Sequence, residues 1–398
     1  MAPSKSALAL TVAGLLACAG MGAYGTFGAG FNNGLFAAIE NSVGHAQPDP
    51  YFISGPKPYR LVYTGFEPFD RQLRTLISFF VLLIDGPKTG DVVLVYWYLM
   101  AQFCAGWSLL FLEGMRRGNA DRAVSWTGVM GLIFQNITYT ITVPLYLVLH
   151  LFTSPLVAVG PATSDLAAVD AIDSMTFPIT SLAAFWGPAV LMALPSPSAR
   201  VSAAMHYSWN ALWQAFPATQ GLYRGVLKLA IPQAHDAGIP QSRRLNRQAL
   251  GYVYGFVALL AAASHLGLLA AALAPASLVP AEYGALVAEV DLLSAFVPRW
   301  PGSPPAVADV GAGARITGAG LPELVKLFLQ WDIYCGGAAI LIWAVYLHGA
   351  AVPGRSLAGL LPKVAVWTLL GGFPAAATVL LWERDWAVFA EEKGKKTQ

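Results

Sequence analysis

The sequence predicts an all-α polytopic membrane protein, a bundle of about eight transmembrane helices around an intramembrane cavity. Of its 398 residues, 56% are hydrophobic and only 12% are charged, whereas soluble domains carry about 25% charged residues. So little charge cannot coat a water-soluble globule of this length. Several apolar stretches also approach the roughly 20 residues that a helix needs to cross a bilayer. We expect one integral membrane domain over residues 1–398.

The N-terminal part opens with an apolar segment at residues 7–27, which is either a first span or a cleaved signal-like segment. Residues 28–67 are rich in Gly and Pro and are expected to form an extramembrane loop. A short span follows if its helix begins near Pro68, where a missing N–H is no loss. Longer spans are predicted at residues 92–112 and 123–152.

The C-terminal half alternates spans with two long polar connections. Residues 195–249 are expected to lie outside the membrane and contain MHYSWNALWQAF, which has the character of an amphipathic interfacial helix anchored by Trp209 and Trp213. Residues 274–320 form a loop or a re-entrant segment. The remaining spans are predicted at residues 170–194, 249–273, 324–347 and 364–381.

The charge pattern leaves the orientation open. The basic loops around Arg116 and Arg243 favour the cytosol by the positive-inside rule. The C-terminus ends KGKKTQ, and its Lys395 and Lys396 match a dilysine retrieval signal of endoplasmic-reticulum membrane proteins, which must be cytosolic. With eight simple crossings these two inferences conflict, unless residues 281–298 re-enter the membrane.

Several classes of function are excluded by what the sequence lacks. A net charge of +2 without a basic block argues against a nucleic-acid partner. The DDxxD, NDxxD, DxDD and HExxH patterns and the Walker signature are absent. We therefore expect no metal, no nucleotide and no other cofactor. The three cysteines lie in apolar stretches and suggest no disulfide framework.

Asp332 is the most informative polar residue, because it lies in LFLQWDIYCGG, about nine residues into a predicted span. A charged side chain at bilayer depth costs from about 2.5 kcal/mol upward and usually faces a protein interior or a cavity. Removal from water favours the neutral, protonated carboxyl. Asp332, flanked by Trp331 and Tyr334, is thus either a proton donor or a hydrogen-bond partner between helices.

A second group of polar and aromatic residues lies in QNITYTITVPLYLVLH. On a continuous helix, five side chains fall within about 80° of one another and form one stripe. Such a stripe lines either a cavity or a hydrogen-bonded contact between helices. Its members are Gln135, Tyr139, Thr142, Tyr146 and His150, with Asn136 and Thr140 beside it.

The motif GFEPFD supplies a further pair of carboxylates. Glu67 and Asp70 are three residues apart and are neighbours if a helix begins at Pro68 or earlier. One interpretation is a pair at the cavity mouth that shares a proton. The other is a helix N-terminus with local ion pairs to Arg71 and Arg74. Other acids near span ends, Glu113 and Asp385 among them, are expected at the membrane interface.

At GFEPFD, TYTITVPLYLVLHLFTSP and LQWD, the chain resembles fungal membrane-bound terpene cyclases of meroterpenoid pathways, the ascochlorin, ascofuranone and macrophorin type. The resemblance extends from about residue 30 to 385. It implies a farnesylated substrate whose cyclisation begins when an acid protonates an epoxide or a terminal alkene. It also implies a fungal host and an endoplasmic-reticulum membrane.

Under this resemblance, Asp332 is the expected acid, with Glu67 and Asp70 as rivals or partners. The expected wall of the cavity is Trp331, Tyr334, Tyr139 and Tyr146, and the expected headgroup contacts are Gln135, Asn136 and His150. The partners would be a prenylated small molecule and the lipid bilayer. The alternative functions are a transporter or exporter of a hydrophobic metabolite, against which the lack of an internal repeat counts, and a non-catalytic scaffold.

Overall fold

The computed structural model describes residues 4–40, 60–85, 89–231, 243–288, 290–302, 320–352, 354 and 357–390, and in these ranges all regular elements are helical. Six helical stretches are long and apolar enough to cross a membrane, and two shorter apolar helices accompany them. The predicted all-α polytopic membrane fold is therefore confirmed. The six stretches are Lys5–Asn32, Gly90–Gly114, Ala171–Ala193, Arg243–Leu273, Gly320–Ala351 and Ala358–Val388, and the shorter helices are Thr127–Ile137 and Tyr139–Thr153.

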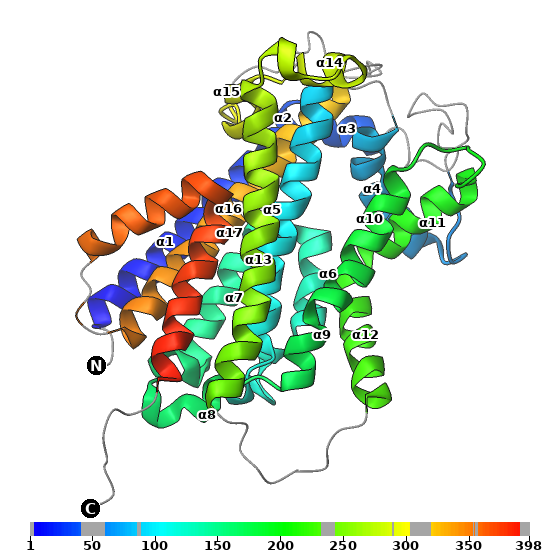
Figure 1. Cartoon of the computed structure of the whole chain (residues 1–398). Coiled ribbons are helices and arrows are strands. Elements are labelled where there is room, and N and C mark those ends of the chain that lie inside the picture. The colour runs from blue at the N-terminus through cyan, green and yellow to red at the C-terminus, as the bar shows by residue number, and fades with distance from the viewer. Residues whose placement is uncertain are drawn as a thin grey trace, which may run out of the picture.

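The centre of the bundle is α5 (Gly90–Gly114), nearly all of whose residues are buried. It packs against α13 (Arg243–Leu273) and α16 (Gly320–Ala351), and α17 (Leu357–Val388) lies against both of these helices (Figure 1). On the outer side of α16, the N-terminal helix α1 (Lys5–Ala23) packs between α16 and α7 (Tyr139–Thr153). The helix that carries Asp332 is thus packed against α1, α5, α7 and α17.

A second group of helices covers the other side of α5 (Figure 1). Here α9 continues through a π-helical turn at Leu182–Trp186 into α10, and together they form one bent span. The next two helices, α11 and α12, pack back onto this group. Its members are α4 (Glu67–Ile84), α6 (Thr127–Ile137), α9 (Ala171–Ser181), α10 (Gly187–Ala193), α11 (Ala203–Gln214) and α12 (Phe216–Ala230).

Short helices close the two ends of the bundle. Figure 1 shows α14 (Ala281–Ala288) and α15 (Leu292–Phe296) at one end and α8 (Ser164–Ala167) at the opposite end. Near the N-terminal helix, α2 (Ala29–Asn32) and α3 (Leu35–Ile39) follow a π-helical turn. The segment expected to be a loop or re-entrant over residues 281–298 contains helices of only 8 and 5 residues, too short to cross a bilayer.

Two sequence-based expectations need correction. The span predicted over residues 123–152 is broken at Thr138, whose φ of 123° ends α6 and starts α7. Trp213, expected as an interfacial anchor, is 1% exposed, because its ring packs 4.5 Å from that of Phe80 in the core. Residues 41–59 of the predicted N-terminal loop, residues 303–319 and the pair Lys395 and Lys396 lie outside the described residues.

Candidate functional site

Asp332 lies on α16 with 8% of its surface exposed, and its Oδ1 accepts a hydrogen bond of 2.8 Å from the backbone N–H of Thr140. Thr140 is the second residue of α7. The first N–H groups of a helix have no acceptor within that helix. The break at Thr138 places such N–H groups inside the bundle, and the carboxyl of Asp332 accepts a hydrogen bond from one of them.

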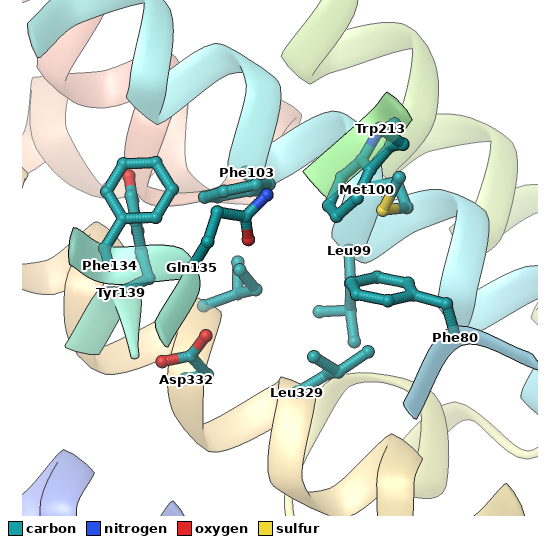
Figure 2. A pocket seen from close by; sticks show the side chains of 11 residues that line it. Phe80, Leu99, Met100, Phe103, Phe134, Gln135, Tyr139, Trp213, Leu329 and Asp332 are labelled. Atoms are coloured by element: carbon teal, nitrogen blue, oxygen red, sulfur yellow. The ribbon is translucent and has the colours of Figure 1, made fainter. Parts of the chain in front are cut away.

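A cavity of about 40 Å³ borders this carboxyl (Figure 2). In the view of Figure 2, Gln135, Phe134 and Tyr139 lie on the same side as Asp332, and Phe80 and Trp213 lie across the space. The lining comes from α4, α5, α6, α7, α11 and α16, so segments far apart in the sequence build it. Its complete lining is Phe80, Leu99, Met100, Phe103, Phe134, Gln135, Tyr139, Trp213, Leu329, Asp332 and Ile333.

Aromatic rings make up much of this wall. The ring of Phe103 lies 4.9 Å from that of Tyr139, edge to face at 88°, and 5.3 Å from that of Phe134. The rings of Phe80 and Trp213 pack against each other at 4.5 Å. Of these five residues only Tyr139 was expected in the wall. The other four lie in continuous apolar runs or in the presumed interfacial helix, where the sequence gives no sign of a cavity.

Two glycines fix the position of Tyr139. A Cβ atom on Gly106 of α5 would lie 2.2 Å from the Tyr139 hydroxyl, and one on Gly336 of α16 would lie 2.3 Å from its ring. Both distances are shorter than any non-bonded contact. Only glycine at these two positions lets the ring lie between α5 and α16 and border the cavity.

A second cavity of about 170 Å³ shares Phe80, Phe134, Gln135, Leu329 and Asp332 with the first. Asp332 therefore borders both. The additional lining is more polar and includes Gln72, Asn136, Thr138 and Gln214. Six phenylalanines also line the second cavity, so the carboxyl lies between two largely aromatic compartments, of which the second carries more amide and hydroxyl groups.

Three buried polar atoms on residues that line these cavities have no hydrogen-bond partner in the part of the chain that the structure describes. They are Nε2 of Gln135, Oγ1 of Thr138 and the hydroxyl oxygen of Tyr139, of which the last packs against Gly106 of α5 rather than facing the space. Most buried polar atoms in proteins are hydrogen-bonded, and each exception calls for an explanation. A polar group of a bound ligand could supply the missing partners.

Of the predicted stripe, Gln135 and Tyr139 border the cavity, and Asn136 lies at the second cavity, where its Oδ1 accepts from Nε2 of Gln72 at 3.0 Å. Tyr146 and His150 lie elsewhere. The hydroxyl of Tyr146 donates to the carbonyl of Val124 at 2.7 Å. The stripe is not continuous, because the break at Thr138 separates Gln135 and Asn136 from the other members.

His150 lies eleven residues beyond Tyr139, about 16 Å further along α7. Its Nδ1 accepts from Nε1 of Trp343 at 3.2 Å, and its Nε2 is 3.3 Å from a carboxylate oxygen of Glu113. Glu113 and Asp385, which lie at the ends of α5 and α17 as expected, are buried and paired with Arg116 and Arg384. His150 thus belongs to an ionic cluster and does not line the cavities beside Asp332.

The two aromatic neighbours of Asp332 in the sequence point away from these cavities. The indole N–H of Trp331 donates to the carbonyl of Arg299 at 3.0 Å. Tyr334 lines a different cavity, and its hydroxyl donates to the carbonyl of Ala295 at 3.3 Å. Successive helical residues are about 100° apart, so residues beside Asp332 in the sequence face other neighbours.

Glu67 and Asp70 also lie outside the lining of both cavities. Glu67 pairs with Arg74 at 2.7 Å, and this hydrogen bond lowers the pKa of its carboxyl. Desolvation opposes ionisation of Asp70, but hydrogen bonds from the N–H and hydroxyl of Thr64 and the N–H of Gly65 hold its pKa below the usual range. Glu67 therefore has the local ion pair of the structural alternative, whereas Asp70 is held at the helix N-terminus by hydrogen bonds alone and Arg71 pairs with Glu40.

The comparison with known proteins covers almost the whole chain. Residues 9–389 match the CtvD domain. The chain is 29% identical to "Terpene cyclase ascI" of Acremonium egyptiacum, over 97% of this chain and 96% of the relative. It is 23% identical to "Terpene cyclase atmA" of Aspergillus flavus, over 89% of this chain and 91% of the relative. It is 24% identical to "Terpene cyclase DEP1" of Fusarium langsethiae, over 80% of each.

No solved structure matches the chain. The family match spans all the helices that build the two cavities, including the segment that carries Asp332. The resemblance to fungal terpene cyclases stated from the sequence is confirmed, and the chain belongs to the CtvD domain family.

Proposed function

We propose that this protein is a membrane-bound terpene cyclase that cyclises a farnesylated meroterpenoid intermediate, with Asp332 as the acid that starts the reaction. The observation that carries the proposal is the position of Asp332, a buried carboxyl at the border of an aromatic cavity. The names of the relatives support the reaction class. The prenylated substrate and the protonation step are our inference.

In the proposed reaction, Asp332 transfers its proton to the terminal alkene or to the epoxide oxygen of the substrate. A carbocation forms, and the neighbouring double bonds attack it to close the rings. Loss of a proton from the last cation to a base ends the cascade, so the product is an isomer of the substrate. Proton transfer by a positioned acid typically contributes a factor of about 10²–10⁴ to the rate.

The two oxygens of the carboxyl would have different roles. Oδ1 accepts from the N–H of Thr140, which fixes the orientation of the group. Oδ2 would carry the proton toward the cavity. Desolvation favours the neutral acid, which is the form that a proton donor needs.

The rings around the cavity would stabilise the positive charge as it moves along the chain. A cation over the face of an aromatic ring gains about 2 kcal/mol or more when it is desolvated. Phe80, Phe103, Phe134, Tyr139 and Trp213 supply such rings. Exclusion of water by the same wall would prevent early capture of the cation.

The unpartnered polar atoms support binding of the polar headgroup in the second cavity. Nε2 of Gln135 can donate, Oγ1 of Thr138 can donate or accept, and Asn136 lies at the same cavity. We assign headgroup binding to these three residues. Among the predicted site residues, Asp332, Gln135, Asn136 and Tyr139 remain in the proposal as groups that contact substrate.

We also propose that the protein resides in the endoplasmic-reticulum membrane. A farnesyl chain partitions into lipid, so an enzyme buried in the bilayer would meet its substrate there. An epitope-tagged full chain expressed in a filamentous fungus should co-fractionate with an endoplasmic-reticulum marker.

The first experiment distinguishes an enzyme from a transporter. Microsomes containing the full chain are opened with detergent and supplied with a farnesylated phenol or its terminal epoxide. We expect a cyclic product of unchanged mass, identified by chromatography and mass spectrometry. Transport has no meaning in opened vesicles, so the absence of any product from a panel of such substrates would contradict the proposal.

The second experiment tests the acid. Asp332→Asn keeps an acceptor for the N–H of Thr140 but carries no proton to transfer, so we expect normal folding and a loss of turnover of about 10²–10⁴-fold. Glu67→Gln is the matched control and should keep its activity, because Glu67 lies outside both cavities. Retained turnover in Asp332→Asn would move the acid role to Glu67 or Asp70.

A further inference from the structure

A third cavity, of about 450 Å³, lies between α5, α13, α15, α16 and α17. Tyr334 faces it, and because Tyr334 and Asp332 are about 200° apart on α16, it lies on the other side of that helix from the proposed acid. Ile333 lines both this cavity and the 40 Å³ cavity beside Asp332, so the two spaces share part of their walls.

The backbone of α17 is broken where it lines this third cavity. Gly371 and Gly372 leave the helical conformation, and Gly372 has a φ of 72°. This positive φ favours glycine, and a Cβ atom there would also lie 2.4 Å from Oε1 of Gln102. Non-helical backbone at membrane depth occurs where it is buried in protein or lines a cavity, and discontinuous helices often form binding sites.

Polar and aromatic groups are built into the otherwise apolar wall. His265 lies on the span α13, with Nδ1 3.4 Å from the hydroxyl of Tyr98 and its ring 4.9 Å from that of Phe296. Oγ1 of Thr368 is buried without a partner among the described residues. Ionisable residues inside membrane spans are usually functional, so these groups indicate a ligand rather than unused space.

Part of the lining of this cavity is exposed on the surface of the bundle. Leu293, Val297 and Leu369 line it and are 69%, 57% and 71% exposed. The short helix α15 lies over one end of the cavity. It is held there by Nε2 of Gln330, which donates to the carbonyls of Ser294 and Ala295 at 2.8 and 3.1 Å. A lipophilic molecule could therefore enter sideways from the membrane.

The volumes argue that the proposed reaction needs this space. Drug-sized ligands occupy pockets of about 300–1,000 Å³. The cavities that border Asp332 have about 40 and 170 Å³ and are too small to hold the headgroup and the whole farnesyl chain together. The third cavity has a sufficient volume and adjoins the acid through Ile333.

We propose that the cavity between α13, α15, α16 and α17 binds the hydrocarbon chain of the prenylated substrate, which passes Ile333 to bring its reactive end to Asp332. This inference rests on the proposed function, because it assigns a second part of the binding site for the same substrate. The competing occupant is an acyl chain of a bilayer lipid.

The test identifies the occupant of the cavity by photolabelling the protein, and it does not depend on turnover. The full-length Asp332→Asn variant in nanodiscs is irradiated with a farnesylated phenol that carries a diazirine on its chain, and the labelled peptides are mapped by mass spectrometry. We expect labels on the α13, α15 and α17 segments that line the third cavity. Excess unlabelled farnesylated phenol should remove them, whereas the same concentration of palmitic acid should not.

Two variants of one helix provide the matched control. Leu269→Trp fills the third cavity, whereas Leu266→Trp, one turn away, adds the same group at a position that is 42% exposed. We expect only Leu269→Trp to lose labelling and, in the active protein, to raise KM about tenfold, as loss of ground-state binding does. If Leu269→Trp does not fold, Thr368→Trp fills the same cavity from α17.

Labels confined to α4, α6 and α11 would overturn the inference, and so would equal displacement by palmitic acid, which indicates an acyl-chain site. Neither result affects the loss of turnover expected for Asp332→Asn. Conversely, if Asp332→Asn keeps its turnover while α13 and α17 are labelled, the acid assignment fails and the chain-binding cavity remains. The two proposals therefore fail separately.

Discussion

Two opposing influences act on the carboxyl of Asp332. The N–H of Thr140 and the N-terminus of α7 favour a negative charge at this position. Burial at membrane depth favours the neutral form. A proton donor has to be protonated before the reaction and able to hold the charge afterwards, and the combination provides both conditions. Asparagine is therefore the most informative replacement, because it preserves the hydrogen bond and removes only the proton.

Asp70 allows a prediction about pH that separates structure from chemistry. Its pKa in the folded protein is lowered, so the charged form stabilises the fold above the unfolded pKa of about 3.9, and this stabilisation is lost as the pH falls through the folded value. Asp70→Asn should lower the melting temperature at pH 7 and flatten its decline between roughly pH 5 and 3. The measurement is thermal unfolding in detergent, followed by tryptophan fluorescence.

Glu67→Gln serves as the comparison in that experiment. Glu67 is exposed and its lowered pKa comes from one ion pair with Arg74, so a smaller change is expected than for Asp70, which has three hydrogen bonds from Thr64 and Gly65. Both variants should keep their cyclase activity. Melting curves of Asp70→Asn that run parallel to those of the wild type at every pH would contradict this account.

At the scale of elements, the break between α6 and α7 decides which residues meet. Thr138 has φ 123° and ψ 148°, a region that is nearly restricted to glycine and costs about 1–3 kcal/mol for other residues. The break turns the N-terminus of α7 toward Asp332. Strain of this kind persists when the surrounding structure holds it in place, and it is frequent at functional sites.

A pair of substitutions measures this strain. Thr138→Ala and Thr138→Gly both remove the hydroxyl, but only glycine adopts a positive φ without a penalty. We expect the glycine variant to be the more stable by about 1 kcal/mol, the reverse of their order in an ordinary helix. Thermal unfolding of the two variants in one detergent provides the comparison. An alanine variant as stable as the glycine variant would mean that Thr138 is not strained.

The break at Thr138 also separates the predictions that depend on one continuous segment from those that assume an unbroken helix. Hydropathy and charge content were sufficient for the membrane fold, because each span is a property of one continuous segment. The helical wheel that joined Gln135 to His150 assumed an unbroken helix, and no Gly marks Thr138 as a break. Asp332 and Gln135 could still be singled out, because a polar group in an apolar span stands out whatever its neighbours are, and both line a cavity in the structure.

The aromatic wall could not be predicted in this way. Phe103 lies in the long apolar run of α5, where every position is hydrophobic and none is distinguished by periodicity. Phe80 and Trp213 meet across two helices that are more than a hundred residues apart in the sequence. The adjacent Gly371 and Gly372, in contrast, are a visible interruption of an apolar span and could have indicated the third cavity.

At the scale of the whole molecule, a buried ionic cluster joins the ends of three central helices. Arg116, just after α5, pairs with Glu113 of α5 and Asp385 of α17, each at 2.6 Å. Arg384 of α17 pairs with Glu113 at 2.9 Å. The hydroxyl of Tyr254 on α13 donates to Asp385 at 2.7 Å. Two acids and two arginines balance in charge, and all four side chains are at most 3% exposed.

This balance predicts how the cluster responds to substitution. Arg384→Met leaves two buried carboxylates facing one arginine, and removal of one partner of a buried ion pair typically costs about 3–5 kcal/mol. Glu113→Gln has the opposite effect, because it leaves two buried arginines facing one carboxylate, Asp385. The double variant leaves Arg116 and Asp385 paired and neutral overall, so its loss of unfolding free energy should be clearly smaller than the sum of the two single losses. Thermal unfolding of the four proteins in the same detergent gives this coupling, and additive losses would show that the charges act independently. The start of α7 lies near Asp332, and the cluster contacts α7 about 16 Å further along that helix, at His150. The turnover per folded molecule should therefore stay unchanged in the double variant.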